Sequence, residues 1–106
     1  DLILSNTFRS ALFGFVKTFS KEVAKYNITC NIILPGYINT ERIRQLWGKE
    51  DNFEKFKGEI IKNVPIGRLI EPEELGNLVE FLISREASAI TGTSIPVDGG
   101  FLKSIP

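Results

Sequence analysis

The spacing of apolar residues near the start of the chain predicts an amphipathic helix over residues 7–25. Its apolar face consists of Phe8, Ala11, Leu12, Phe15, Val16, Phe19 and Val23, which fall at helical spacing. Ser5, Asn6 or Thr7 can supply the N-cap of this helix. Gly14 in its middle costs about 1 kcal/mol relative to Ala, which is tolerable where another helix or a sheet approaches closely.

Two shorter apolar runs predict strands. Residues 28–34 are too continuously apolar at their end for burial on one side only, which suits a parallel strand covered on both faces. Pro35 and Gly36 end this run. Residues 94–97 form the second strand, and Pro96 places it near an edge or at a point that needs no backbone donor.

The segments between the strands predict helices. Residues 41–63 are polar and helical in pieces, either as a solvated pair of amphipathic helices or as a lid that turns Trp47 and the phenylalanines toward a substrate. Residues 64–68 form a turn. A helix over residues 72–84 begins with proline and acidic residues. Its buried stripe consists of Leu75, Leu78, Val79 and Leu82. The order of helix, strand, helices, helix and strand is typical of an α/β fold.

Composition narrows the classes of function. The chain has 106 residues, one domain or part of one, and its 13 basic and 13 acidic side chains give zero net charge, which argues against nucleic acid or an anionic membrane as a partner. No apolar run approaches the 18 residues of a membrane span, and no signal peptide is visible. The chain has no Met, so we expect its true N-terminus to be missing.

The single cysteine and the lack of histidine limit the chemistry further. Cys30 cannot form an internal disulfide, which fits a cytoplasmic location, and its place in an apolar run predicts a buried, unreactive thiol. Transition-metal binding is improbable without histidine or a cysteine cluster. Acid/base chemistry that depends on histidine is excluded for this chain.

Several short motifs, in order and at matching spacing, resemble the C-terminal half of a short-chain dehydrogenase/reductase. They lie at residues 21–31, 34–40, 66–74, 81–84 and 91–100. Within that family the chain resembles 3-oxoacyl-acyl-carrier-protein reductases. The resemblance implies an α/β fold, the C-terminal half of a Rossmann-type doubly wound parallel sheet. Residues 1–106 would then be the C-terminal part of a single NAD(P)-binding Rossmann domain, with the N-terminal part and its glycine-rich loop absent.

The Pro-Gly-x-x-x-Thr motif predicts a cofactor contact. A loop that leaves the carboxyl end of a parallel strand lies where ligands bind in open α/β sheets. The resemblance implies that Pro35, Gly36, Ile38 and Thr40 contact the cofactor. Gly36 would let the backbone approach the ligand, the backbone near Ile38 would hold the nicotinamide carboxamide, and the Thr40 hydroxyl would add a hydrogen bond. The alternative is that Pro-Gly only turns the chain and that Thr40 caps the next helix.

The catalytic Tyr-x-x-x-Lys motif of the family is missing. Neither of the two tyrosines is followed by a lysine four residues later. The resemblance places Ser5 at the tyrosine position and Arg9 at the lysine position, and residues 4–9 resemble a divergent branch that reads Leu-Ser-Asn-x-x-Arg. A serine hydroxyl is a much weaker acid than a phenol, and an arginine keeps its proton. The alternatives are that Ser5 is an N-cap and Arg9 a solvated or paired arginine.

Two further polar residues have structural interpretations. Asn31 is predicted to be a hydrogen-bonding residue at a strand edge rather than a catalytic group. Asp98, followed by two glycines, is predicted to set a tight turn and a subunit contact rather than to bind a metal.

The resemblance implies an oxidoreductase that transfers hydride between NAD or NADP and a small-molecule carbonyl or alcohol. The alternative is a family member that has lost catalysis and acts as a nucleotide-binding or oligomeric structural subunit. We expect no nucleic-acid or membrane partner, and a homodimer or homotetramer that pairs the helix over residues 7–25 with its symmetry mate.

Overall fold

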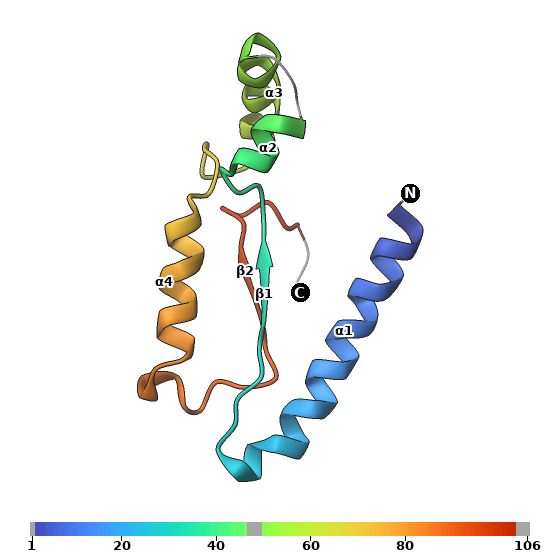
Figure 1. Cartoon of the computed structure of the whole chain (residues 1–106), viewed down its shortest axis with the longest axis vertical. Helices are drawn as coiled ribbons and strands as arrows, with labels where there is room; N and C mark the ends of the chain where they lie inside the picture. The colour runs from blue at the N-terminus through green and yellow to red at the C-terminus, as the bar shows by residue number, and fades with distance from the viewer. Residues whose placement is uncertain (1, 47–49, 104–106) are drawn as a thin grey trace. The chain divides into compact units, whose positions relative to one another are not determined.

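A computed structural model describes residues 2–46 and 50–103 of the chain (Figure 1). The described elements, in order, are α1 (Leu2–Val23), η1 (Ala24–Tyr26), β1 (Ile32–Pro35), α2 (Glu41–Leu46), α3 (Glu50–Asn63), α4 (Pro72–Leu82), η2 (Arg85–Ala87) and β2 (Ser94–Val97). The chain divides into two compact units, Asp1–Ile33 with Glu80–Ile95, and Leu34–Val79 with Pro96–Pro106. Each unit is described by itself.

Helix α1 of the first unit begins five residues earlier than predicted. Because it starts at Leu2, Ser5 lies inside the helix and none of the three predicted N-cap residues can cap it. The Thr7 hydroxyl instead donates a hydrogen bond to the Ile3 carbonyl, 2.8 Å away. The helix runs into the short η1 turn, after which Asn27 adopts a left-handed conformation with φ of 60°.

Only the second half of α1 finds a partner within its unit. Val16 and Ser20 are buried, and the Lys17 ammonium donates to the Gly92 carbonyl at 3.0 Å. A side chain at Gly92 would meet the Ser20 hydroxyl at 2.6 Å, so this loop packs directly on the helix. Most of the predicted apolar face is uncovered: Phe8 is 74% exposed, and Leu12, Phe15 and Phe19 are exposed as well. A side chain at Gly14 would meet nothing within 4 Å among the described residues.

Strands β1 and β2 are parallel neighbours, which agrees with the parallel sheet that the family resemblance implies (Figure 1). The Ile32 amide donates to the Thr93 carbonyl at 2.9 Å, and the Gly36 amide donates to the Val97 carbonyl at 3.0 Å, so both chains advance in the same direction. The prediction of burial on both faces is wrong within the described residues. The residues of β1 and β2 are half-buried, except for the exposed Pro35, because only two described strands form this sheet.

The first strand is shorter than its apolar run. Residues 28–31 precede β1 and bind the loop before β2 through polar groups. The Cys30 amide donates to the Thr91 hydroxyl, and the Asn31 side chain donates to the Ile90 carbonyl and accepts from the Thr93 amide. Asn31 is therefore a structural hydrogen-bonding residue, as predicted. Cys30 is a free thiol that is half-buried rather than buried.

The second unit has its core between α3 and the loop that follows it. Ile60, Val64 and Leu69 form a buried cluster, and Tyr37 and Phe53 pack against it. The predicted turn at residues 64–68 is present, and the Gly67 amide closes it on the Val64 carbonyl at 2.8 Å. The predicted helical pieces of residues 41–63 are α2 and α3; Trp47 lies outside the described residues.

Helix α4 matches the predicted helix, but its predicted buried stripe is wrong. Its acidic first turn is present, yet none of its residues is buried, and Val79 is 43% exposed. The described residues do not supply enough sheet to cover the stripe. None of the described helices is both long and apolar enough to cross a membrane.

Candidate active site

The Pro-Gly loop leaves the carboxyl end of β1, which is where the sequence predicts a cofactor contact. Pro35 is the last residue of β1, and the Gly36 amide continues the pairing with β2 through its bond to the Val97 carbonyl. A Cβ atom at Gly36 would lie 2.7 Å from the Cα atom of Asp98. The close approach that requires glycine here is therefore to the protein's own backbone.

The backbone around Ile38 is held by hydrogen bonds on both sides. The Ile70 amide donates to the Tyr37 carbonyl at 2.9 Å, and the Asn39 amide donates to the Ile70 carbonyl at 2.8 Å, which makes an isolated parallel bridge between Ile38 and Ile70. In such a bridge the N–H and C=O of the central residue point away from the partner. The Ile38 carbonyl accepts from the Thr40 amide at 2.9 Å. Its N–H makes no hydrogen bond among the described residues.

This arrangement fits a nicotinamide carboxamide. A fixed amide N–H that faces away from its own ladder is a ready donor for a ligand carbonyl, because an N–H that a ligand covers without pairing it is costly. The residues present at Gly36, Ile38 and Thr40 thus allow the cofactor contact that the motif predicts.

Thr40 caps the following helix, which is the structural alternative to a cofactor contact that the sequence left open. It precedes α2, and its hydroxyl accepts from the Ile43 amide at 3.4 Å, while its carbonyl accepts from Ile43 and Arg44. It is therefore the N-cap of α2. Accepting this bond leaves the hydroxyl proton available, so a second bond to a cofactor is compatible with capping.

Asp98 is buried and uses both carboxylate oxygens within its own turn. One oxygen accepts from the Gly100 amide and the other from the Leu102 amide, each at 2.9 Å. The predicted tight turn is confirmed, and Gly99 and Gly100 both have positive φ angles. Within residues 2–46 and 50–103, no group of three or more His, Cys, Asp or Glu side chains is placed to hold a metal ion.

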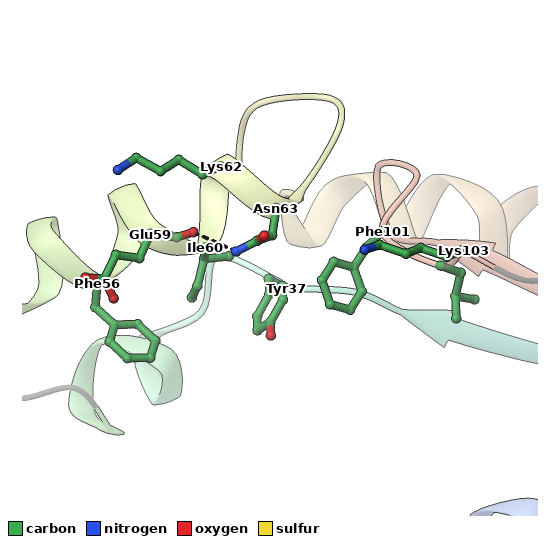
Figure 2. Close-up of a pocket in the computed structure, with 9 residues that line it drawn as sticks. Tyr37, Phe56, Glu59, Ile60, Lys62, Asn63, Phe101 and Lys103 are labelled. Carbon is green, nitrogen blue, oxygen red and sulfur yellow. Dashed lines mark hydrogen bonds between the residues drawn. The ribbon is translucent and has the colours of Figure 1, made fainter.

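A cavity of about 830 Å³ opens beside the loop, within the second unit (Figure 2). Its apolar lining comes from Tyr37, Phe56, Ile60, Phe101 and Leu102, and its polar lining from Glu59, Lys62, Asn63 and Lys103. The rings of Tyr37 and Phe101 meet edge to face, with centroids 5.3 Å apart.

Sequence reasoning missed this cavity. The available signal for Tyr37 was its position in the loop that the motif predicts to contact the cofactor. Nothing local marked Phe101 as a cavity residue. The contribution of α3 is consistent with the predicted lid, whose closure stays a prediction.

A charged cluster fixes the segment that pairs with Ile38. Arg68 forms a two-point ion pair with Glu74, with nitrogen–oxygen distances of 2.7 and 2.8 Å, and Glu74 also accepts from the Glu71 amide. The hydrogen bonds from Arg68, and next that from the Glu71 amide, lower the pKa of Glu74 to about 2. The Glu71 carboxylate in turn accepts from the Asn39 side chain at 3.0 Å. This cluster links the start of α4 to Asn39, in the loop that follows β1.

Ser5 and Arg9 lie one turn apart on α1, with Ser5 half-buried and Arg9 exposed. They belong to the first unit. The predicted cofactor residues Pro35, Gly36, Ile38 and Thr40 all lie in the second unit. The pairing of Ser5 with Arg9 on one helical face agrees with their predicted spacing. Their catalytic role stays a prediction.

Paired parallel strands, the helices between them and a Pro-Gly loop at the carboxyl end of the first strand define part of a nucleotide-binding α/β domain. The chain belongs to the short-chain dehydrogenase/reductase family. Residues 4–102 match the family model described as enoyl-(acyl carrier protein) reductase.

Named relatives agree with this assignment. The acetoacetyl-CoA reductase of Shinella zoogloeoides is 45% identical over 87 residues, which are 82% of this chain and 34% of that protein. The 3-oxoacyl-[acyl-carrier-protein] reductase FabG of Chlamydia muridarum is 42% identical over 92 residues, 87% of this chain and 35% of that protein. The chain therefore spans about a third of the length of the curated relatives it matches.

Solved structures show the same fold. The L-sorbose reductase of Gluconobacter frateurii, solved with NADPH and L-sorbose, has a TM-score of 0.86 at 34% identity, over 94% of this chain and 40% of that one. YwfH, an NADPH-dependent reductase involved in bacilysin biosynthesis, has a TM-score of 0.82 at 39% identity, over 91% of this chain and 38% of that one.

Proposed function

We propose that the full-length protein is an NAD(P)-dependent oxidoreductase that transfers hydride between the cofactor and a small-molecule carbonyl or alcohol. The observation that carries this proposal is the Ile38 N–H, which is held by the bonds of its neighbours to Ile70 and makes no bond of its own among the described residues. The names of the relatives support it, since they are reductases, and one solved relative was crystallised with NADPH.

The bound cofactor would supply the hydride, and this chain would orient it. Ile38 would donate its N–H to the carboxamide, and the Thr40 hydroxyl would donate to the carboxamide or the diphosphate. Pro35 and Gly36 would set the loop at the end of β1. In this proposal residues 1–106 are the C-terminal part of one Rossmann domain, and a preceding part carries the diphosphate loop.

The substrate would enter the cavity beside the loop. Its lining combines aromatic and aliphatic side chains with lysines at Lys62 and Lys103, which suits an apolar acyl group joined to an anionic carrier. We therefore propose a 3-oxoacyl thioester as the substrate class, in line with the names of the matched relatives.

A second candidate function is a nucleotide-binding or structural subunit with impaired catalysis. The serine at position 5 favours it, because a serine hydroxyl cannot replace the acidity of a phenol. The exposed apolar side chains of α1, Phe8 and Phe15 among them, suit either candidate, because both would pair this helix in a homodimer or homotetramer. The single cysteine supports a cytoplasmic location for either.

The test is a titration of the full-length protein with NADPH and NADH. Ile38→Pro removes the proposed donor, and Ile38→Val keeps it, so only the proline variant should weaken binding, by about tenfold for one lost hydrogen bond to a ligand. The unfolding temperature of both variants shows whether the loop survives. Wild-type protein that binds neither nucleotide would overturn the proposal, and turnover of acetoacetyl-CoA separates the enzyme from the impaired subunit.

A further inference from the structure

The chain holds two tyrosines, and the structure places them in opposite settings. Tyr26 lies in η1 and is 65% exposed, with the Lys25 ammonium 5.1 Å from its ring centre. Tyr37 lies in the cofactor loop, between Gly36 and Ile38, and lines the cavity beside that loop. Of the two tyrosines, Tyr37 is thus the one that lines the cavity proposed above for the substrate.

The ring of Tyr37 is held on several sides. Its backbone carbonyl accepts from the Ile70 amide at 2.9 Å, its ring packs against the core cluster that contains Ile60, and Phe101 meets it edge to face. Figure 2 shows the hydroxyl of Tyr37 at the end of the ring that points away from α3. That hydroxyl makes no hydrogen bond to any other described residue. The protein thus fixes the ring and leaves its polar atom to the cavity.

We propose that Tyr37 is a catalytic residue, the proton donor to the substrate carbonyl in the reduction proposed above, on which this inference rests. The carbonyl carbon would gain hydride from the dihydronicotinamide, which becomes oxidised. The carbonyl oxygen would gain the phenolic proton of Tyr37, which gives the alcohol and a phenolate. Solvent water in the cavity then returns a proton to the phenolate.

The chemistry of the site supports a phenol in this role. A phenol has an ordinary pKa of about 10, and nearby positive charge favours its ionised form. The charged groups that line the cavity with Tyr37 are Lys62 and Glu59 from α3 and Lys103 from the segment after β2. A phenol is a far stronger acid than a serine hydroxyl, so its proton is the more easily released of the two. Tyr37 would supply the acidity that Ser5 lacks.

The test compares Tyr37→Phe with Tyr26→Phe in the full-length protein. Both changes remove one hydroxyl and keep the ring, so Tyr26→Phe is a matched control. Reduction of acetoacetyl-CoA by NADPH should lose about 10²–10⁴-fold in kcat in Tyr37→Phe, with KM, NADPH affinity and unfolding temperature unchanged. Tyr26→Phe should behave as wild type.

Two results would overturn the role of Tyr37: a kcat in Tyr37→Phe equal to that of Tyr26→Phe, or a raised KM with kcat preserved. If Tyr37→Phe does not fold, fluorotyrosine at residue 37 replaces it, because fluorine keeps the ring and changes the acidity of the hydroxyl. A kcat equal to that of wild type would then overturn the role equally. Wild-type protein that fails to bind NADPH would overturn the proposed function itself. The nucleotide titration therefore distinguishes the two failures.

Discussion

Gly36 and Asp98 approach so closely that residue 36 has no room for a side chain. A Cβ atom there would lie 2.7 Å from the Asp98 Cα atom and 2.9 Å from its Cβ atom. Two residues that are 62 positions apart thus bring the loop that follows β1 against the turn that follows β2. Asp98 holds that turn with both carboxylate oxygens, so a change at residue 36 would disturb an ordered turn.

Gly36→Ala should therefore destabilise the full-length protein. The nearest neighbours of the new methyl group are backbone and Cβ atoms of Asp98, which cannot swing away. Overpacking of this kind costs about 1–3 kcal/mol. Gly58→Ala is the matched control, because a Cβ atom at Gly58 in α3 meets nothing within 4 Å. That change should stabilise by up to about 1 kcal/mol. Urea unfolding measures both, and equal effects of the two changes would contradict the contact.

The Arg68–Glu74 pair predicts an acid-sensitive contribution to stability. Because the folded-state pKa of Glu74 is lowered from its ordinary 4.5 to about 2, the stabilisation is fully present above pH 4.5 and is lost as pH falls toward 2. Glu74→Gln should thus destabilise the protein at pH 7 and have a shrinking effect below pH 4.5. The pair is exposed, so the effect should be small. Unfolding midpoints across this range check it, and a difference that is constant with pH would contradict it.

Ser5 should contribute little to turnover. A serine hydroxyl is too weak an acid to deliver a proton near neutral pH, so Ser5→Ala should change kcat by less than about twofold. The double substitution of Ser5→Tyr with Arg9→Lys restores a phenol beside a cation and should raise kcat. Steady-state reduction of acetoacetyl-CoA measures both variants. A large loss in Ser5→Ala would assign the proton donor to α1 instead of Tyr37.

Helix α1 should mediate self-association of the full-length protein. Phe13 lies outside the apolar face of this helix and is 37% exposed, which favours a contact with a second copy. Phe13→Lys should shift a dimer or tetramer toward monomer, as measured by light scattering at micromolar concentration. Thr18→Lys adds the same charge at another exposed position of α1 and should leave the assembly intact. A wild-type protein that is monomeric under these conditions would contradict the prediction.

Local patterns sufficed for the order of the elements and for the points where they end. Proline and glycine stop β1 and form the turn before α4, because proline lacks a donor and glycine reaches conformations closed to other residues. The hydrogen bonds of the Asn31 side chain and the turn at Asp98 also followed from residue type, because amide and carboxylate side chains bond readily to backbone groups. The start of α1 did not, because Ser5, Asn6 and Thr7 are good caps that also tolerate a helix interior.

Only the tertiary structure decided what each face of a helix or strand contacts. The burial predicted for α4 and for both faces of β1 fails within the described residues, because burial depends on sheet that these residues do not supply. Residue 36 must be glycine because Asp98 leaves no room for a side chain there. The position of Tyr37 is fixed by contacts with Ile70, Ile60 and Phe101. Periodicity reports which residues share a face of one element. Contacts between segments that are distant in the sequence decide that Asp98 limits the space at Gly36 and that Tyr37 lines a cavity.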